Sequence, residues 1–177
     1  MRFTETSLPG VYLVDIEPIA DERGFFSRIW CQQEFDTHGL DSVTAQSSIS
    51  FNRRRGTVRG MHYQVAPHQE AKLVRCIAGS LLDVVMDLRP GTPTYGRWLG
   101  TELTSINRRS LFIPQGLAHG FQTLEDNTEV LYCISHAFHP GSSRGIRWDD
   151  PAFSIDWPIR SGIIISGKDS TYPDHIL

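Results

Sequence analysis

The chain has 177 residues, and 17 lysines and arginines against 20 acidic residues give a formal net charge of −3 at pH 7. That length suits one domain, and 40% hydrophobic with 21% charged residues exclude wholesale disorder. The near-neutral charge, without a basic block, argues against nucleic acid as a partner.

The first predicted elements are a strand, a turn and a helix. Residues 11–16 have the composition of a β-strand and precede a turn-forming segment at 21–24. Residues 32–38, followed by Gly39, have the pattern of a short helix with a glycine stop. No other segment predicts a helix as clearly.

A hairpin is predicted next, with strands at 72–77 and 81–88 and a glycine-containing turn between them. In its second strand, apolar residues at the even positions alternate with Asp83, Val85 and Asp87. Two acids on one face of an apolar strand indicate either a polar cavity or an exposed edge. The exposed edge is the commoner case.

Four further strands are predicted at 97–104, 110–113, 120–124 and 129–138. The 15 glycines and 10 prolines are scattered through the chain, which favours short strands joined by turns. The spacing of the strands predicts an all-β sandwich, jelly roll or barrel. With no shift in composition along the chain, we expect a single domain over 1–177.

Three widely spaced cysteines, Cys31, Cys76 and Cys133, match neither a zinc motif nor a disulfide framework. The N-terminus lacks the apolar segment of a signal peptide, and no run reaches the roughly 18 apolar residues of a membrane helix. We therefore expect a cytoplasmic protein with no membrane partner.

Two histidines lie in glycine-containing β-rich segments. His62 follows Arg59 and Gly60, and His119 stands between Gly116 and Gly120. Glycine beside a polar side chain often marks close approach of the backbone to a ligand. Each histidine alone is more often a hydrogen-bonded structural residue.

The spacing from Pro114 to His119 resembles the second motif of the cupins, whose metal-binding members use that histidine as a ligand. The first motif of those members has His-x-His, whereas this chain has His62-Tyr63-Gln64. Because Fe, Mn and Zn sites need three or four protein ligands, we expect no metal.

An ordered set of segments from about residue 8 to 173 resembles one cupin family, the dTDP-4-dehydrorhamnose 3,5-epimerases of deoxysugar biosynthesis. The matching segments are 21–26, 59–64, 72–75, 83–89, 93–96, 113–121, 129–132, 148–151, 157–158 and 166–169. The resemblance implies a cupin-type double-stranded β-helix, or jelly roll, with short peripheral helices.

The resemblance also implies an isomerase that acts on a nucleotide-linked 4-keto-6-deoxyhexose. Such an enzyme removes a proton next to the ketone and returns one on the opposite face, and it needs no cofactor. By similarity, His62 is the base, Lys72 stabilises the enolate and Tyr132 is the acid. Asp169 is the expected partner that orients His62, with Asp83 as the rival.

Substrate-binding residues follow from the same resemblance. Arg23 and Arg59 suit the diphosphate, because guanidinium groups bind phosphate oxygens bidentately. Phe26 offers a ring to the base, Lys168 a nucleotide contact, and His119 neighbours the reacting sugar. In the family, the segment with Arg23 and Phe26 reaches the other subunit, which implies a homodimer with an exchanged N-terminal strand.

The chain departs from the family pattern at three further positions expected to bind substrate. Arg28 replaces a glutamate, Ser48 replaces an asparagine close to the retained Gln46, and Phe138 replaces a tyrosine. Two alternatives therefore stay open: a non-catalytic cupin that binds a sugar nucleotide, and a metal-dependent cupin. The complete acid–base set favours the epimerase.

Overall fold

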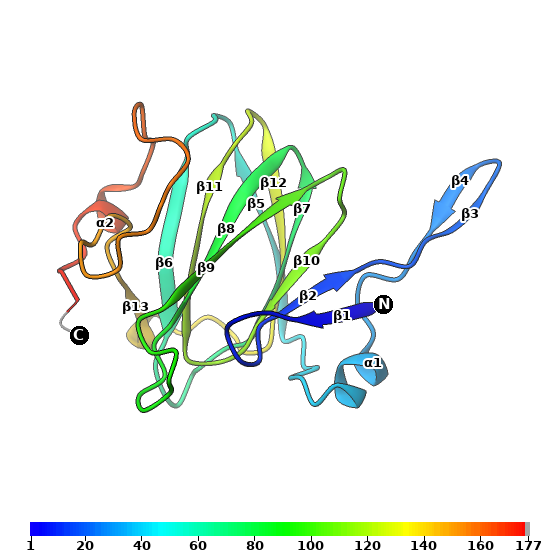
Figure 1. Ribbon diagram of the computed structural model, residues 1–177, viewed down its shortest axis with the longest axis horizontal. Helices are drawn as coiled ribbons and strands as arrows, with labels where there is room; N and C mark the ends of the chain where they lie inside the picture. The colour runs from blue at the N-terminus through cyan, green and yellow to red at the C-terminus, as the bar shows by residue number, and fades with distance from the viewer. Residues whose placement is uncertain (176–177) are drawn as a thin grey trace.

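Two antiparallel sheets make up most of the computed structural model, which describes residues 1–175 (Figure 1). The six-stranded sheet has the order β1 (Arg2–Glu5), β2 (Tyr12–Asp15), β10 (Ser110–Ile113), β7 (Lys72–Ala78), β12 (Thr128–Ile134), β5 (Gln46–Asn52). The five-stranded sheet has the order β13 (Ser143–Gly145), β6 (Val58–Gln64), β11 (Leu117–Thr123), β8 (Ser80–Asp87), β9 (Trp98–Thr104). The expected all-β jelly roll is confirmed.

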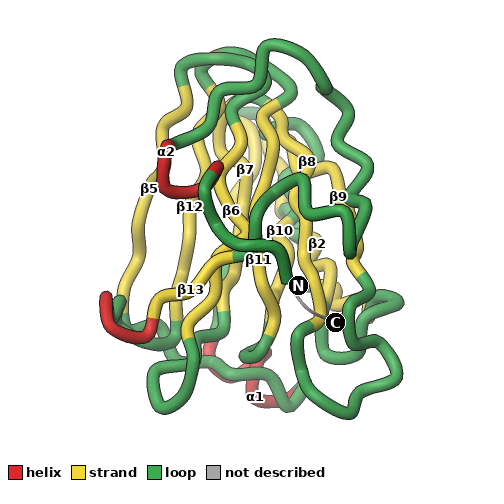
Figure 2. Tube along the Cα trace, turned by 90° about the vertical axis from the view of Figure 1, so that its left-hand side faces the viewer, coloured by secondary structure: helices red, strands yellow, loops and turns green. Residues whose placement is uncertain are grey.

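Helices are short and lie at the periphery (Figure 2). The predicted helix is α1 (Gln32–Thr37), and Gly39 behind it has the positive φ of +67° that a glycine stop requires. Near the C-terminal end lies α2 (Gly167–Ser170), and a 3-10 turn spans Pro140–Ser142. No described helix is long and apolar enough to cross a membrane.

The predicted hairpin between β7 and β8 is wrong. Strand β7 pairs with β10 and β12, whereas β8 pairs with β11 and β9, so the turn at Gly79 carries the chain from one sheet to the other. Both strands are buried along most of their length. Strands that are apolar on both faces take inner positions in a sheet, and here each takes one in its own sheet.

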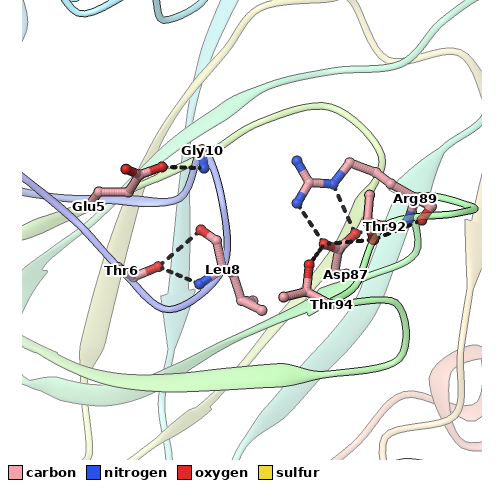
Figure 3. A network of polar contacts seen from close by, with 8 residues as sticks. All are labelled: Glu5, Thr6, Leu8, Gly10, Asp87, Arg89, Thr92 and Thr94. Carbon is pink, nitrogen blue, oxygen red and sulfur yellow. Dashed lines mark hydrogen bonds and ion pairs between the residues drawn. The ribbon is translucent and has the colours of Figure 1, made fainter.

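The acids of β8 do not form an exposed edge, because β9 covers that strand and both carboxylates are fully buried. Asp87 accepts hydrogen bonds from Arg89 and from Thr94 in the turn after the strand, the latter at 2.6 Å (Figure 3). Asp83 pairs with His119 in the interior. The exposed edge is therefore wrong, and of the two acids only Asp83 is connected to a polar cavity, through His119, which lines it.

Apolar residues fill three layers. One cluster between the sheets includes Val74, Val85 and Leu111. The outer face of the five-stranded sheet is covered by the segment after β13, which includes Trp157. The outer face of the six-stranded sheet is covered by α1 through Phe35. The rest of the space between the sheets is lined mostly by polar residues and contains the site described below.

The two-stranded hairpin of β3 (Ile19–Asp21) and β4 (Gly24–Phe26) stands away from both sheets (Figure 1). Its side chains Ile19 and Phe26 are each 74% exposed. Apolar side chains so exposed on a projecting hairpin are typical of an interaction surface.

Candidate active site

A cavity of about 630 Å³ lies between the two sheets, beside strands β5 and β6. Most of the residues expected from the sequence line it: Gln46, Ser48, Arg59, His62, Lys72, His119, Tyr132, Phe138, Lys168 and Asp169. Arg23, Phe26 and Arg28 are the expected residues that do not. Within residues 1–175, no group of three or more His, Cys, Asp or Glu side chains is arranged to hold a metal ion.

Two glycines bring β6 and β11 close together at the candidate histidines. The register pairs His62 with His119, so both side chains lie on one face of the sheet. A Cβ at Gly60 would lie 2.4 Å from the Cα of Gly120, and one at Gly120 would lie 2.7 Å from the carbonyl oxygen of Arg59. The register also shifts here, so that Arg59 and His62, three residues apart, both line the cavity.

His62 and Asp169 form a hydrogen-bonded pair, with Nε2 of the ring 2.8 Å from Oδ1 of the carboxylate. Ser166 caps α2 by accepting the N–H of Asp169 at 3.1 Å, which fixes the carboxylate over β6. Burial disfavours the charged carboxylate, but hydrogen bonds from His62 and Gly60 outweigh it, and the pKa of Asp169 lies below its usual value. The carboxylate is therefore ionised at neutral pH and orients the imidazole.

Asp83 belongs to a second pair. His119 Nε2 lies 2.6 Å from its Oδ1, and the two side chains are almost completely buried. The other oxygen of Asp83 is buried and has no hydrogen-bond partner among the described residues. Of the two acids considered for His62, the structure thus places Asp169 against that ring and Asp83 against His119.

Tyr132 and Lys72 face the cavity from the six-stranded sheet, opposite the strand that carries His62. The ring of Tyr132 lies 6.1 Å from that of His119 between centroids. Burial, with the negative charge of Asp83, raises the pKa of Tyr132 well above its usual value, so the phenol keeps its proton at neutral pH. Lys72 is buried and pairs with Glu70 at 3.0 Å.

Two more cations line the cavity, Arg59 and Lys168. The guanidinium of Arg59 is anchored through Nε, which donates to Oδ1 of Asn52 at 2.7 Å. Lys168 lies next to Asp169 in α2, with Nζ 6.0 Å from the ring centroid of Tyr172. Lys72 is offset by Glu70, whereas Arg59 and Lys168 are cations of the lining with no carboxylate partner among the described residues, which suits an anionic ligand.

The three expected residues outside the cavity lie on or beside the projecting hairpin. Arg23 and Phe26 belong to its turn and second strand. Arg28 follows it and forms an ion pair with Glu34 of α1 at 3.1 Å. This chain's own hairpin therefore does not bring these side chains to its own cavity.

Sequence reasoning missed Glu70 and Asn52, which hold two of the cations, and it treated Gln64 only as a missing metal ligand. A signal for Glu70 was present: it stands two residues before Lys72, and such residues lie on the same side of an extended chain. Asn52 carries no comparable signal, because its contact with Arg59 depends on how β5 and β6 face each other.

The arrangement provides the groups that proton transfer at carbon requires. An imidazole backed by a carboxylate lies on one wall, and a protonated phenol and an ammonium lie on the facing wall. A flat enolate between them would have a base on one side, an acid on the other and a cation for its oxygen.

Comparisons with known proteins agree with this chemistry. The family model for dTDP-4-dehydrorhamnose 3,5-epimerase matches residues 5–175. The enzyme of that name from Sinorhizobium fredii is 39% identical over 173 residues, which are 98% of this chain and 89% of the relative.

Solved structures give the same result. That of dTDP-4-dehydrorhamnose 3,5-epimerase from Elizabethkingia anophelis superimposes with a TM-score of 0.95 at 33% identity, covering 98% of this chain and 96% of the other. A Legionella pneumophila dTDP-6-deoxy-D-glucose-3,5-epimerase in complex with dTDP-4-keto-L-rhamnose gives 0.91 at 32%, covering 97% and 90%. The chain therefore belongs to the dTDP-4-dehydrorhamnose 3,5-epimerase family of sugar-nucleotide epimerases, which are isomerases.

Proposed function

We propose that this protein epimerises a dTDP-linked 4-keto-6-deoxyhexose by proton transfer next to the ketone. One observation carries the proposal. His62, paired with Asp169, faces the cavity from the five-stranded sheet, and Tyr132 faces the same cavity from the six-stranded sheet. Inversion at a carbon of an enolate that stays in place needs proton removal on one face and proton delivery on the other, and therefore a group on each side.

In the proposed reaction, the ring nitrogen of His62 that does not face Asp169 takes the proton from the carbon beside the ketone. The electron pair left behind forms the enolate, and the ammonium of Lys72 stabilises the negative oxygen. The hydroxyl of Tyr132 then donates its proton to the opposite face of the carbon, and the ketone forms again. Before the next turnover, His62 loses its proton to solvent and Tyr132 takes one up from solvent.

The remaining residues of the cavity are assigned to the nucleotide and the sugar. Arg59 and Lys168 would neutralise the diphosphate, while His119, fixed by Asp83, would contact the sugar. The polar side chains Gln46 and Ser48 on β5 are available to the nucleoside. Phe138 lines the same wall, and its backbone N–H donates to Oε1 of Gln46 at 3.0 Å.

Arg23, Phe26 and Arg28 would serve the cavity of a second copy in a homodimer. The exchanged element would be the β3–β4 hairpin, because β1 and β2 already pair within this chain's own sheet. The exposed apolar side chains of the hairpin support this arrangement. Under it, Arg28 would contribute next to the partner's nucleotide only after leaving Glu34.

The reaction is tested by incubating the protein with dTDP-4-keto-6-deoxyglucose in deuterium oxide. Each inverted carbon gains one deuteron from solvent, which mass spectrometry counts and NMR locates at carbon 3 or carbon 5. We expect incorporation in the wild type and none in His62→Asn. Nucleotide binding by calorimetry, with no incorporation from dTDP-, CDP- and GDP-linked substrates, would instead show a non-catalytic binder.

A further inference from the structure

Glu70 holds the ammonium of Lys72 from inside the protein. Its Oε1 lies 3.0 Å from Nζ, and each of the two side chains is only 10% exposed. Lys72 also donates to the backbone carbonyl of His62 at 3.5 Å. Because an ammonium has three N–H donors, one remains for a ligand in the cavity that Lys72 lines.

Glu70 is itself fixed by Gln64, at the end of β6. The Nε2 of Gln64 donates to Oε2 of Glu70 at 2.8 Å and to the carbonyl of His68 at 2.9 Å. Its Oε1 accepts the backbone N–H of His139 at 2.6 Å. Gln64 is buried, and its Nε2 also donates to the carbonyl oxygen of Ala137 at 3.4 Å, so Glu70 is the shortest of three acceptor contacts of this amide. Turning the carboxylate away would give up that contact for the longer one to Ala137.

These contacts join the strand that carries the base to the strand that carries the cation. Gln64 ends β6 two residues after His62, and Lys72 begins β7 two residues after Glu70. The ion pair and the amide close the connection between them. The distance from the imidazole to the ammonium is thereby set by side chains and not only by the loop.

We propose that Glu70, oriented by Gln64, is a positioning residue that holds the Lys72 ammonium where the enolate oxygen forms. The inference rests on the proposed function, because it assigns Lys72 to that oxygen. A preorganised cation needs no rearrangement when charge develops, and this is the main source of electrostatic catalysis. Glu70 also lines the cavity, but its two oxygens are engaged by Lys72 and by Gln64, so we assign it a role through Lys72.

The first test is a double-mutant cycle. Glu70→Gln keeps the shape of the side chain and removes its charge, and we expect kcat to fall about 10- to 100-fold through misplacement of the cation. KM changes much less, since Arg59 and Lys168 still bind the diphosphate. Glu102→Gln, the same change on an exposed part of β9, leaves kcat unchanged.

The decisive comparison is made in the Lys72→Ala background. Its low activity is measured as deuterium exchange into the substrate, which NMR detects over hours. If Glu70 acts through Lys72, adding Glu70→Gln lowers kcat no further there. If Glu70→Gln lowers kcat equally in both backgrounds, Glu70 has a general structural role and the inference is overturned. A wild-type kcat in the single variant Glu70→Gln would also overturn it.

A second measurement does not depend on turnover. The rate of acetylation of Lys72 by acetic anhydride is measured by peptide mass spectrometry, with Lys168 as internal reference. Glu70→Gln should raise the ratio several-fold, because the ammonium loses its buried counter-charge. An unchanged ratio would overturn the inference. If the wild type shows no deuterium exchange, the proposed function is refuted, and with it the contribution of Glu70 to the reaction. The acetylation ratio would still report whether Glu70 holds Lys72.

Discussion

Replacing Asp169 with asparagine tests the central pair of the proposed mechanism. The carboxylate accepts from His62 at 2.8 Å and is only 7% exposed, so water screens its charge poorly. When His62 takes the substrate proton, the imidazolium gains a charged hydrogen bond, which is worth about 1.5–3 kcal/mol. Losing it should lower kcat about 10- to 100-fold. Asparagine can also donate to the ring and favour the wrong tautomer, which adds to the loss.

The assay is kcat from deuterium incorporation, with nucleotide binding by calorimetry in parallel. Binding should persist, since Arg59 and Lys168 supply the contacts to the diphosphate. Asp156→Asn is the matched control, because Asp156 is exposed and pairs only with Arg160 at the surface. A kcat for Asp169→Asn within about twofold of wild type would mean that the pair does not assist proton transfer.

The same variant gives a pH dependence of stability with a fixed sign. The pKa of Asp169 is lower in the folded protein than in the unfolded chain, so its contribution is present above the unfolded pKa. That contribution disappears as the pH falls through the folded pKa. The Tm difference between wild type and Asp169→Asn should therefore be largest near neutral pH and shrink as the pH falls below the ordinary aspartate pKa toward the lower folded pKa. A difference that grows in acid would contradict the sign.

Three further predictions concern the acid, the close strand contact and the hairpin. Tyr132→Phe should still exchange the substrate's proton for deuterium through His62 but yield about 10²- to 10⁴-fold less inverted product, which NMR distinguishes from simple exchange; equal losses of both would argue against Tyr132 as the acid. Gly120→Ala should lower the free energy of unfolding by about 1–3 kcal/mol in denaturant titration, whereas Gly167→Ala, with no atom within 4 Å of the added Cβ, should change it little. Phe26→Glu should convert the expected dimer to monomer in analytical ultracentrifugation, and a monomeric wild type would refute the exchanged hairpin.

The apolar strands and the helix could be predicted from the sequence because their side chains repeat with the period of the element. Strands β5 and β6 could not, since their inward positions carry polar side chains such as Ser48, Ser50 and His62. Those residues line a cavity and do not pack in a core, so the alternation of apolar and polar residues is lost. The strand that carries His62 is therefore among those that could not be predicted, whereas β7 and β12, which carry Lys72 and Tyr132, could be predicted from their apolar residues.

The partner of His62 could not be fixed from the sequence either. Both Asp83 and Asp169 lie in segments with the right residue type, and both turn out to bind a histidine. Which acid meets which ring depends on register: His119 lies two residues along β11 from the position opposite Asp83, whereas α2 folds back beside β6. Only the path of the chain in three dimensions carries that information.

The C-terminal segment joins stability to chemistry. A cavity between the sheets removes part of the core that a β-sandwich would otherwise fill, and apolar packing on the outer faces offsets the loss. Trp157 and Phe153 supply that packing over Met61, the neighbour of His62 on β6. The same segment then continues to Asp169 in α2. The segment that covers β6 on its outer face therefore also supplies the carboxylate that orients His62. A change that loosens this packing should displace Asp169 as well as destabilise the sheet.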